Sequence, residues 1–408
     1  MLSLIFFISY TFGVLPMNFM VEKYGKRNIF IFCTFCVAAG SVLKNIACRP
    51  HLFWLTFIGQ TLVSFSTTYY YGSPVHIAAS YFRENEINKV VAILVFGMSF
   101  GNAMGFVITP NVVAGVDNEA NIAFRLEVFM LVQTLISIAL FLLVLLFFYD
   151  NPLKQKNVAT NQREFSFLFT LKSLFNNRNY VLLVISAGCV MGVFYSQLIN
   201  LNQMVLSKYP KSGQTVGTIG MLLMFSGCLS LPFLGYITDK FKSPKTLYKV
   251  CNVLALCATT CYTLSYTFKT VGLLYLTTTI MGFFLSSNSY LSLCVAYDIT
   301  HPLSQSLISG IVVASNQLFG VLFSFIGTKL IISHGAIICN SVFVFIIVFV
   351  IIIDCFIHDN KCESGLELEA TSLLEESKKV IDVSALLKFH QLDEERQHRF
   401  LDRSNLTI

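Results

Sequence analysis

Three polar or aromatic side chains inside otherwise apolar stretches could bind a small cation. Tyr195 lies in Gly192-Val-Phe-Tyr195, and Asn316 and Gln317 are adjacent in another apolar stretch. An aromatic face attracts a quaternary ammonium by about 0.5–2 kcal/mol without needing a counter-ion. Amide oxygens accept hydrogen bonds from a hydroxyl or an ammonium group. These residue types predict a site for a small polar or cationic molecule; the alternative is that Tyr195 and Gln317 only pack between helices.

A further pair of polar residues, Ser99 and Asn102, lies in the apolar stretch 90–115. Residues three apart share one face of a helix, so both could contribute to the same site. Gly97, Gly101 and Gly105 recur every four residues in this stretch, a pattern that lets another membrane helix approach closely. Ser99 therefore has an alternative role as a helix–helix contact.

Ionisable side chains are scarce where such a site would lie. No Asp, Glu, Lys, Arg or His lies well inside the apolar stretches. Proton relays in membranes use buried ionisable residues, so their scarcity favours facilitative movement over proton-coupled transport. It also leaves no cluster of catalytic residues, no metal site and no expected cofactor, which argues against a membrane-embedded enzyme. A receptor that binds without transporting remains as an alternative class.

The elements that must position these residues are apolar segments of membrane-spanning length. The chain is 55% hydrophobic and 12% charged with a mean hydropathy of +0.69, and soluble domains carry roughly twice this charged fraction. Its composition predicts an all-α polytopic membrane protein in a lipid bilayer, and we expect no nucleic-acid binding from the +6 net charge. The eleven segments are 1–20, 29–47, 53–75, 90–115, 126–149, 179–206, 214–237, 247–267, 271–296, 305–331 and 335–357.

The longest internal connection divides these segments into two groups, 1–149 and 179–357. Connections after the first, third, fifth and seventh segments hold about twice as many Lys and Arg residues as the opposite connections, which places them in the cytoplasm. The connection 150–178 and the polar tail 358–408 are then cytoplasmic. Within the connection, Glu164–Phe175 has the apolar spacing of a short amphipathic helix at the membrane surface.

A short acidic and basic pattern occurs twice, six segments apart. Glu22-Lys23-Tyr24-Gly25-Lys26-Arg27 follows the first segment, and Gly235-Tyr-Ile-Thr-Asp239-Lys240 spans the end of the seventh. Ordinary cytoplasmic loops would explain the bases but not the repeated acid. The pattern resembles the signature loop of the major facilitator superfamily, found between helices two and three and again between helices eight and nine. The resemblance implies a gating role for the residues Glu22, Lys23, Gly25, Arg27, Gly235, Asp239 and Lys240, in which each acid accepts hydrogen bonds and latches the two halves.

The same resemblance implies a major facilitator fold with two pseudo-symmetric six-helix halves around a central cavity. Since the first loop would then follow helix two, we expect 11 transmembrane helices, that is twelve minus helix one, as in a fragment or an incomplete gene model.

A closer resemblance covers almost all of the chain up to residue 357. The matching stretches are Leu52–Thr61, Gly72–Arg83, Asn177–Ser186, Gly192–Met204, Ile299–Leu303 and Ala314–Ser324. They resemble the feline leukaemia virus subgroup C receptor-related transporters. This resemblance implies facilitated movement of choline and ethanolamine, with haem export as the alternative within the family.

Family residues carry over to only some positions. A tyrosine and a glutamine that contact the substrate in this family align with Tyr195 and Gln317. A second family glutamine falls on Ser99, and a family glutamate falls on Cys294. The family tryptophan on helix one has no counterpart, because Trp54 lies at the end of a segment. These departures leave choline, ethanolamine and haem open as substrates.

Haem would need an axial ligand such as histidine. The seven His residues lie near segment ends, in connections or in the tail, so the residues rank haem below an amine.

The tail contains Glu369-Ala-Thr-Ser-Leu373-Leu374, the spacing of an acidic dileucine sorting signal. A clathrin adaptor is therefore an expected partner, although the same residues also fit an amphipathic helix. We expect residence in the plasma membrane, with endolysosomal and mitochondrial membranes as alternatives.

Overall fold

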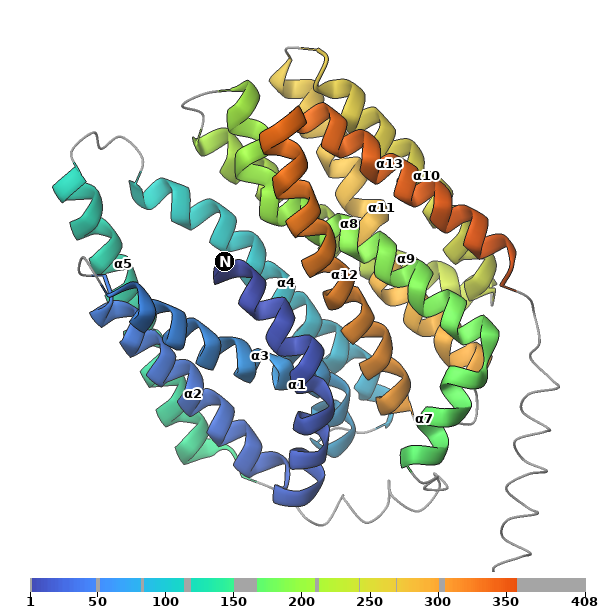
Figure 1. Ribbon diagram of the computed structural model, residues 1–408. Coiled ribbons are helices and arrows are strands. Elements are labelled where there is room, and N and C mark those ends of the chain that lie inside the picture. Colours follow the sequence, from blue (N-terminus) through green and yellow to red (C-terminus); the bar gives the residue numbers. More distant parts are fainter. Residues whose placement is uncertain are drawn as a thin grey trace, which may run out of the picture. The chain divides into compact units, whose positions relative to one another are not determined.

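In the computed structural model, the described parts of the chain are residues 2–48, 52–81, 84–113, 119–149, 167–209, 213–241, 243–268, 270–300 and 305–357. These parts form twelve helices and contain no strand (Figure 1). The helices are α1 (Leu2–Tyr24), α2 (Lys26–Ile46), α3 (Phe53–Tyr81), α4 (Glu84–Val113), α5 (Glu119–Phe147), α7 (Phe167–Asn176), α8 (Arg178–Lys208), α9 (Gly213–Phe241), α10 (Pro244–Ser265), α11 (Val271–Thr300), α12 (Gln305–His334) and α13 (Ala336–Cys355). The prediction of an all-α protein is confirmed.

The long helices have the composition that a membrane requires. Eight of them (α2, α5 and α8–α13) are long and apolar enough over their described residues to span a bilayer, and α1 has a shorter apolar stretch, Leu4–Val14. Many hydroxyl groups bond back to their own helix, such as Thr259 Oγ1, which donates to the Ala255 carbonyl at 2.8 Å. These bonds satisfy polar groups that lipid cannot.

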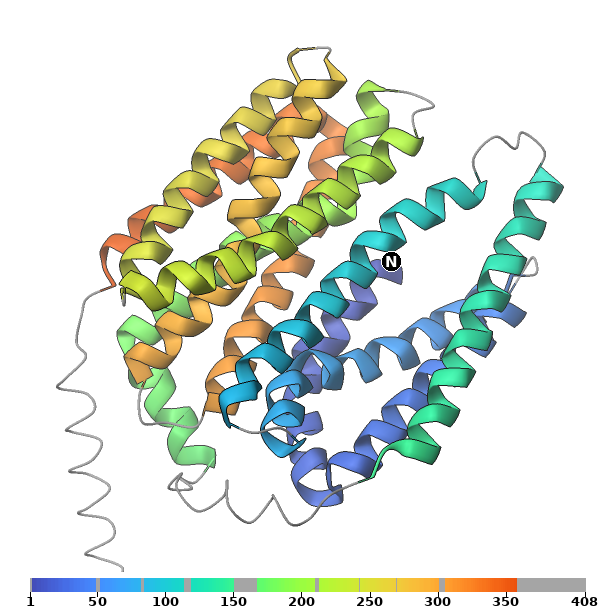
Figure 2. The same cartoon turned by 180° about the vertical axis from the view of Figure 1, so that it is seen from behind.

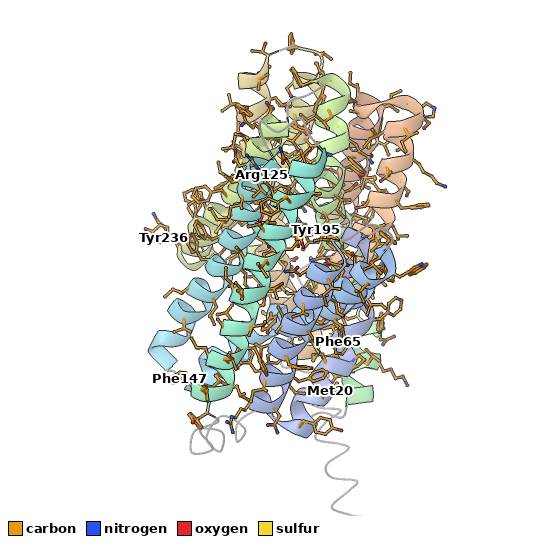
Figure 3. All side chains as sticks on the ribbon, turned by 90° about the vertical axis from the view of Figure 1, so that its left-hand side faces the viewer. Met20, Phe65, Arg125, Phe147, Tyr195 and Tyr236 are labelled. Carbon is orange, nitrogen blue, oxygen red and sulfur yellow. The ribbon has the colours of Figure 1, made fainter. Side chains whose placement is uncertain are left out.

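Helices α1–α5 form the N-terminal half. Helix α1 packs on α3, and α2 packs on both α3 and α5. The α2–α3 contact depends on two glycines: a Cβ on Gly40 would lie 2.6 Å from the Gly59 carbonyl oxygen. The two helix backbones therefore touch directly. Met20 and Phe65 pack on the small core of this half, and Figure 3 shows Met20 near one end of it with Phe65 farther in.

Helices α8–α13 form the C-terminal half, with α8 at its centre. Helix α8 packs on α12 and α13, and α10 packs on α13. Gly192 of α8 lies against Phe319 and Phe323 of α12, where a Cβ would approach both residues to 2.9 Å. This half contains the larger apolar core, which includes Val190, Leu223 and Phe343.

The two halves repeat one packing plan. Figures 1 and 2 both show α2 beside α5 and, in the other half, α10 beside α13. The most extensive contacts between the halves are those of α4 with α9 and of α1 with α12. At the first, a Cβ on Gly217 would lie 2.7 Å from the Phe106 carbonyl oxygen, and Gly220 faces the Phe106 ring. The predicted arrangement of two pseudo-symmetric halves is confirmed.

Among the described helices, α8 has no counterpart in the N-terminal half. Its position against α12 and α13 corresponds to a groove of about 720 Å³ between α4 and α5, lined by residues such as Gly101, Gly105 and Val128. A Cβ added at Gly97, Gly101 or Gly105 would meet nothing within 4 Å. Helix α5 runs along this groove, with Arg125 and Phe147 toward its opposite ends in Figure 3.

The short helix α7 falls where an amphipathic helix was predicted. It covers Phe167–Asn176, and its contacts are with α8 and α12. Asn177 then caps α8, with its side-chain oxygen accepting from the Tyr180 backbone N–H at 3.2 Å. The surface position of α7 stays a prediction, and residues 150–166 and the tail 358–408 lie outside the described residues.

Candidate substrate-binding site

Tyr195 lies where the two halves meet. Its half-buried ring on α8 contacts the Phe7 ring of α1, with centroids 4.9 Å apart and the planes at 53°. The ring centroid of Phe194 lies 5.8 Å from that of Tyr195, and the ring centroid of Phe6 lies 5.7 Å from that of Phe7. Figure 3 shows Tyr195 about midway along the helices. Phe7 was not expected from the sequence, since nothing but its tertiary contact distinguishes it among 39 Phe residues.

Gly320 of α12 completes the meeting point. A Cβ there would lie 3.1 Å from Cδ2 of Tyr195 and 3.6 Å from Cδ1 of Phe7. The absence of a side chain at this position lets both rings sit against the α12 backbone. Helices α1, α8 and α12 therefore place two aromatic faces together, one from each half of the protein.

Asn316 and Gln317 lie one helical turn before Gly320, so the three residues share one side of α12. They are 2% and 1% exposed, and neither Asn316 Oδ1 nor Gln317 Oε1 has a hydrogen-bond partner. Leaving a buried acceptor unpaired costs about 1–3 kcal/mol. These two oxygens are available to a donor from a ligand, as their residue types suggested, and their role in binding stays a prediction.

The residues on α4 are less closely connected to this point. Ser99 is half-buried and makes a side-chain contact with Cys228 of α9. Asn102 is exposed, next to Gly101, which lines the α4–α5 groove. The Ser99 contact favours its alternative role between helices, and substrate binding by Ser99 and Asn102 stays a prediction.

In the first predicted gating loop, Gly25 and Arg27 are described in detail. Gly25 has a φ of 82°, a left-handed conformation that favours glycine, and it separates α1 from α2. Arg27 donates from Nε to the Phe148 carbonyl at 2.8 Å and lies 5.1 Å from the centre of the Tyr149 ring. A cation at the carboxyl end of α5 is favoured by the helix dipole. This contact stays within the N-terminal half.

The second predicted gating loop is described at Gly235 and Lys240. Gly235 is half-buried near Tyr290, and Lys240 is exposed beside its neighbour Phe241. The side chains of Glu22, Lys23 and Asp239 lie outside the described residues. The latch between the two halves stays a prediction.

A buried carboxylate was not expected. Asp354 is 2% exposed although it stands in the last turn of α13. Ser186 Oγ donates to Asp354 Oδ1 at 2.5 Å, and Asn252 Nδ2 donates to Oδ2 at 2.7 Å. It lies near the end of an apolar segment, and its hydrogen-bond donors on α8 and α10 enclose it. Within the described residues, no three His, Cys, Asp or Glu side chains gather as metal ligands.

Comparison with known proteins agrees with this architecture. The model of the family described as Major Facilitator Superfamily matches residues 1–210 and 198–365.

Similar curated proteins are named as transporters. The chain is 29% identical over 365 residues to the uncharacterized MFS-type transporter C09D4.1 of Caenorhabditis elegans, covering 88% of this chain and 62% of that protein. It is also 29% identical over 345 residues to the human choline/ethanolamine transporter FLVCR2, covering 83% of this chain and 64% of that protein. The chain thus spans less than two thirds of the length of these relatives. The resemblance to the feline leukaemia virus subgroup C receptor-related family is confirmed.

Solved structures show a similar fold. The fucose:proton symporter FucP of E. coli matches with a TM-score of 0.60 at 13% identity, covering 88% of this chain and 90% of that one. The xylose transporter XylE of E. coli matches with a TM-score of 0.65 at 12% identity, covering 88% and 87%. At these identities the likeness concerns the fold alone.

Proposed function

The chain belongs to the Major Facilitator Superfamily, and we propose that it carries a small organic cation such as choline or ethanolamine across the membrane by alternating access. Relatives at 25–29% identity are named choline/ethanolamine transporters, which supports this substrate class. The protein is a multi-pass membrane transporter and not an enzyme. Movement down the gradient of the substrate, without a coupled proton, is part of the proposal.

The contact between Tyr195 and Phe7 is the observation that carries the proposal. Each ring offers a face that attracts a quaternary ammonium by about 0.5–2 kcal/mol. Because Phe7 belongs to α1 and Tyr195 to α8, a relative movement of the two halves would part the rings and expose both faces. Such weak attraction suits a carrier, which must release what it binds.

The unpaired amide oxygens give the site a polar side. Asn316 Oδ1 and Gln317 Oε1 can accept from the hydroxyl of choline or ethanolamine, or from the ammonium of ethanolamine. Both groups are neutral, so binding would not depend on the protonation of a carboxylate at this point. The loops around Glu22 and Asp239 would hold the cytoplasmic ends together in one state.

Haem export is less well supported. His334 is exposed and contacts its neighbour Ser333, which makes it a poor axial ligand. The other six histidine side chains lie outside the described residues.

A receptor without transport would bind the amine with no flux. Plasma-membrane residence and an adaptor contact through Glu369–Leu374 remain proposals from the sequence, and those residues also lie outside the description.

The test is uptake of radiolabelled choline and ethanolamine in cells that lack their own transporters. Uptake by the unaltered protein should exceed background and should fall at least about threefold in Tyr195→Ala and Gln317→Ala, because each change removes a direct contact. Phe345→Ala is the matched control, since this aromatic residue of α13 is 73% exposed and belongs to neither the proposed site nor the gating loops. Equal uptake by all four proteins, at equal surface expression, would exclude this site.

A further inference from the structure

Oxygen atoms from four helices gather around Asp354 in the C-terminal half. Ser186 of α8 and Asn252 of α10 donate to the two carboxylate oxygens. The Tyr248 hydroxyl lies 2.8 Å from Ser186 Oγ and also makes side-chain contacts with Asn252 and Asn288. Asn288 of α11 donates from Nδ2 to Asn252 Oδ1 at 2.8 Å. All five residues are buried, with exposed fractions of 2% or less.

One oxygen of this cluster has no partner. Asn288 Oδ1 is buried and accepts no hydrogen bond. It belongs to the same amide group whose nitrogen bonds Asn252, so it lies at the cluster and not on the far side of α11. An unpaired buried acceptor in a hydrogen-bonded network that ends on a carboxylate is an environment for a positively charged species.

The charge of Asp354 is not balanced by direct contact with a basic side chain. Its hydrogen-bond donors, Ser186 and Asn252, are neutral. Lys249 of α10 interacts with it electrostatically, but its Nζ donates to the Ile357 carbonyl at 3.3 Å. Lys245, the other basic residue on this part of α10, is buried one turn earlier. An ionised carboxylate buried in a membrane domain is costly unless a cation lies beside it.

We infer that this cluster is a binding site for one monovalent metal cation, Na⁺. The residues that would bind it are Ser186, Tyr248, Asn252, Asn288 and Asp354. Hard cations prefer carboxylate, amide and hydroxyl oxygens, which are the groups present. One carboxylate balances one positive charge, whereas divalent sites usually contain more acidic ligands.

The site is separate from the proposed amine site. Ser186 and Tyr195 are nine residues apart on α8, which is about 13 Å along a helix. A cation that joins α8 to α10, α11 and α13 would stabilise the C-terminal half as one body. The inference does not depend on the identity of the transported substrate.

The experiment measures binding of ²²Na⁺ to the purified protein in detergent, with N-methylglucamine as the replacing cation. We expect about one Na⁺ per chain and a thermal midpoint that rises with Na⁺ concentration until the site is saturated. Asp354→Asn keeps the shape but removes the charge, and it should weaken Na⁺ binding about tenfold or more. Asn288→Ala keeps Asp354 and both of its donors, so it tests the unpaired oxygen if Asp354→Asn does not fold.

Thr259→Val is the matched control, because Thr259 is buried on α10 but bonds only its own helix at Ala255. It should bind Na⁺ like the unaltered protein. Absence of Na⁺ binding by the unaltered protein would overturn the inference. It would also be overturned if both cluster variants bound Na⁺ as tightly as the unaltered protein. A thermal midpoint that responds to pH but not to Na⁺ would assign the site to a proton and would also overturn it. None of these readouts requires choline transport, so a failed amine proposal would be recognised separately.

Discussion

Substitution of Gly320 by Ala probes the contact between the two aromatic rings without removing either one. The added Cβ would lie 3.1 Å from Cδ2 and 3.3 Å from Cβ of Tyr195. Ordinary van der Waals contacts are 3.4–4 Å, so the ring must move by a few tenths of an ångström. Overpacking of this kind costs about 1–3 kcal/mol. Ala is favoured over Gly in a helix by about 1 kcal/mol, so the free energy of unfolding should fall by only about 0–2 kcal/mol.

The effect on transport should appear as a weaker apparent affinity for choline. If the displaced ring loses its cation–π contribution of about 0.5–2 kcal/mol, the KM for choline rises about 2- to 30-fold. The assay is the concentration dependence of radiolabelled choline uptake at matched surface expression. Gly272→Ala is the control, because a Cβ at this position of α11 would meet nothing within 4 Å.

A double-mutant comparison decides whether the effect acts through Tyr195. In a Tyr195→Ala background the added methyl group has no ring to displace, so Gly320→Ala should change KM by less than about twofold. An unchanged KM for Gly320→Ala alone would refute the reasoning. The same increase with and without the Tyr195 ring would refute it as well, because the methyl group would then act elsewhere.

Two other substitutions test contacts in the N-terminal half. Arg27→Ala removes the donor to the Phe148 carbonyl and should lower the free energy of unfolding by about 1 kcal/mol, whereas Arg27→Lys should lose only part of this. Thermal unfolding in detergent measures both effects. Equal stability of the two variants and the unaltered protein would contradict the contact. Gly40→Val should greatly reduce the yield of folded protein in size-exclusion chromatography, because the α2 backbone at Gly40 lies against Gly59 of α3. Gly213→Val is the control and should have little effect, because a Cβ at Gly213 would meet nothing within 4 Å. Similar yields of the two variants would argue against the close approach of α2 and α3.

The fold could largely be predicted because lipid imposes the same requirement on every spanning segment. Apolar runs of sufficient length must be helical, and the two similar loops indicated two repeated halves. Helix ends were less predictable. The segment predicted at 53–75 continues to Tyr81 in α3, and the segment predicted at 90–115 already begins at Glu84 in α4. Hydropathy marks the part of a helix within lipid, whereas the backbone hydrogen bonds continue into polar residues beyond it.

The candidate sites were only partly predictable. Tyr195 and Gln317 stand out because they are polar or aromatic residues in segments that match a known family. Phe7 carries no such signal, since its significance arises from a ring on another half of the chain. Asp354 was missed for a different reason: whether a residue near a helix end is solvated or enclosed depends on which helices pack beside it, and periodicity does not report this.

The contact between α4 and α9 has a mechanical consequence. Gly217 and Gly220 present bare backbone to Phe106, so at these two positions α9 has no side chain that could interlock with α4. Close backbone contact of this kind lets α4 and α9 tilt against each other at this point, as at a hinge, while the contact of Ser99 with Cys228 tethers the same two helices. On the α1–α12 side, by contrast, a pair of rings must separate. The two halves should therefore rotate about the glycine contact between α4 and α9, and the opening should form on the opposite side, where the rings of Phe7 and Tyr195 separate.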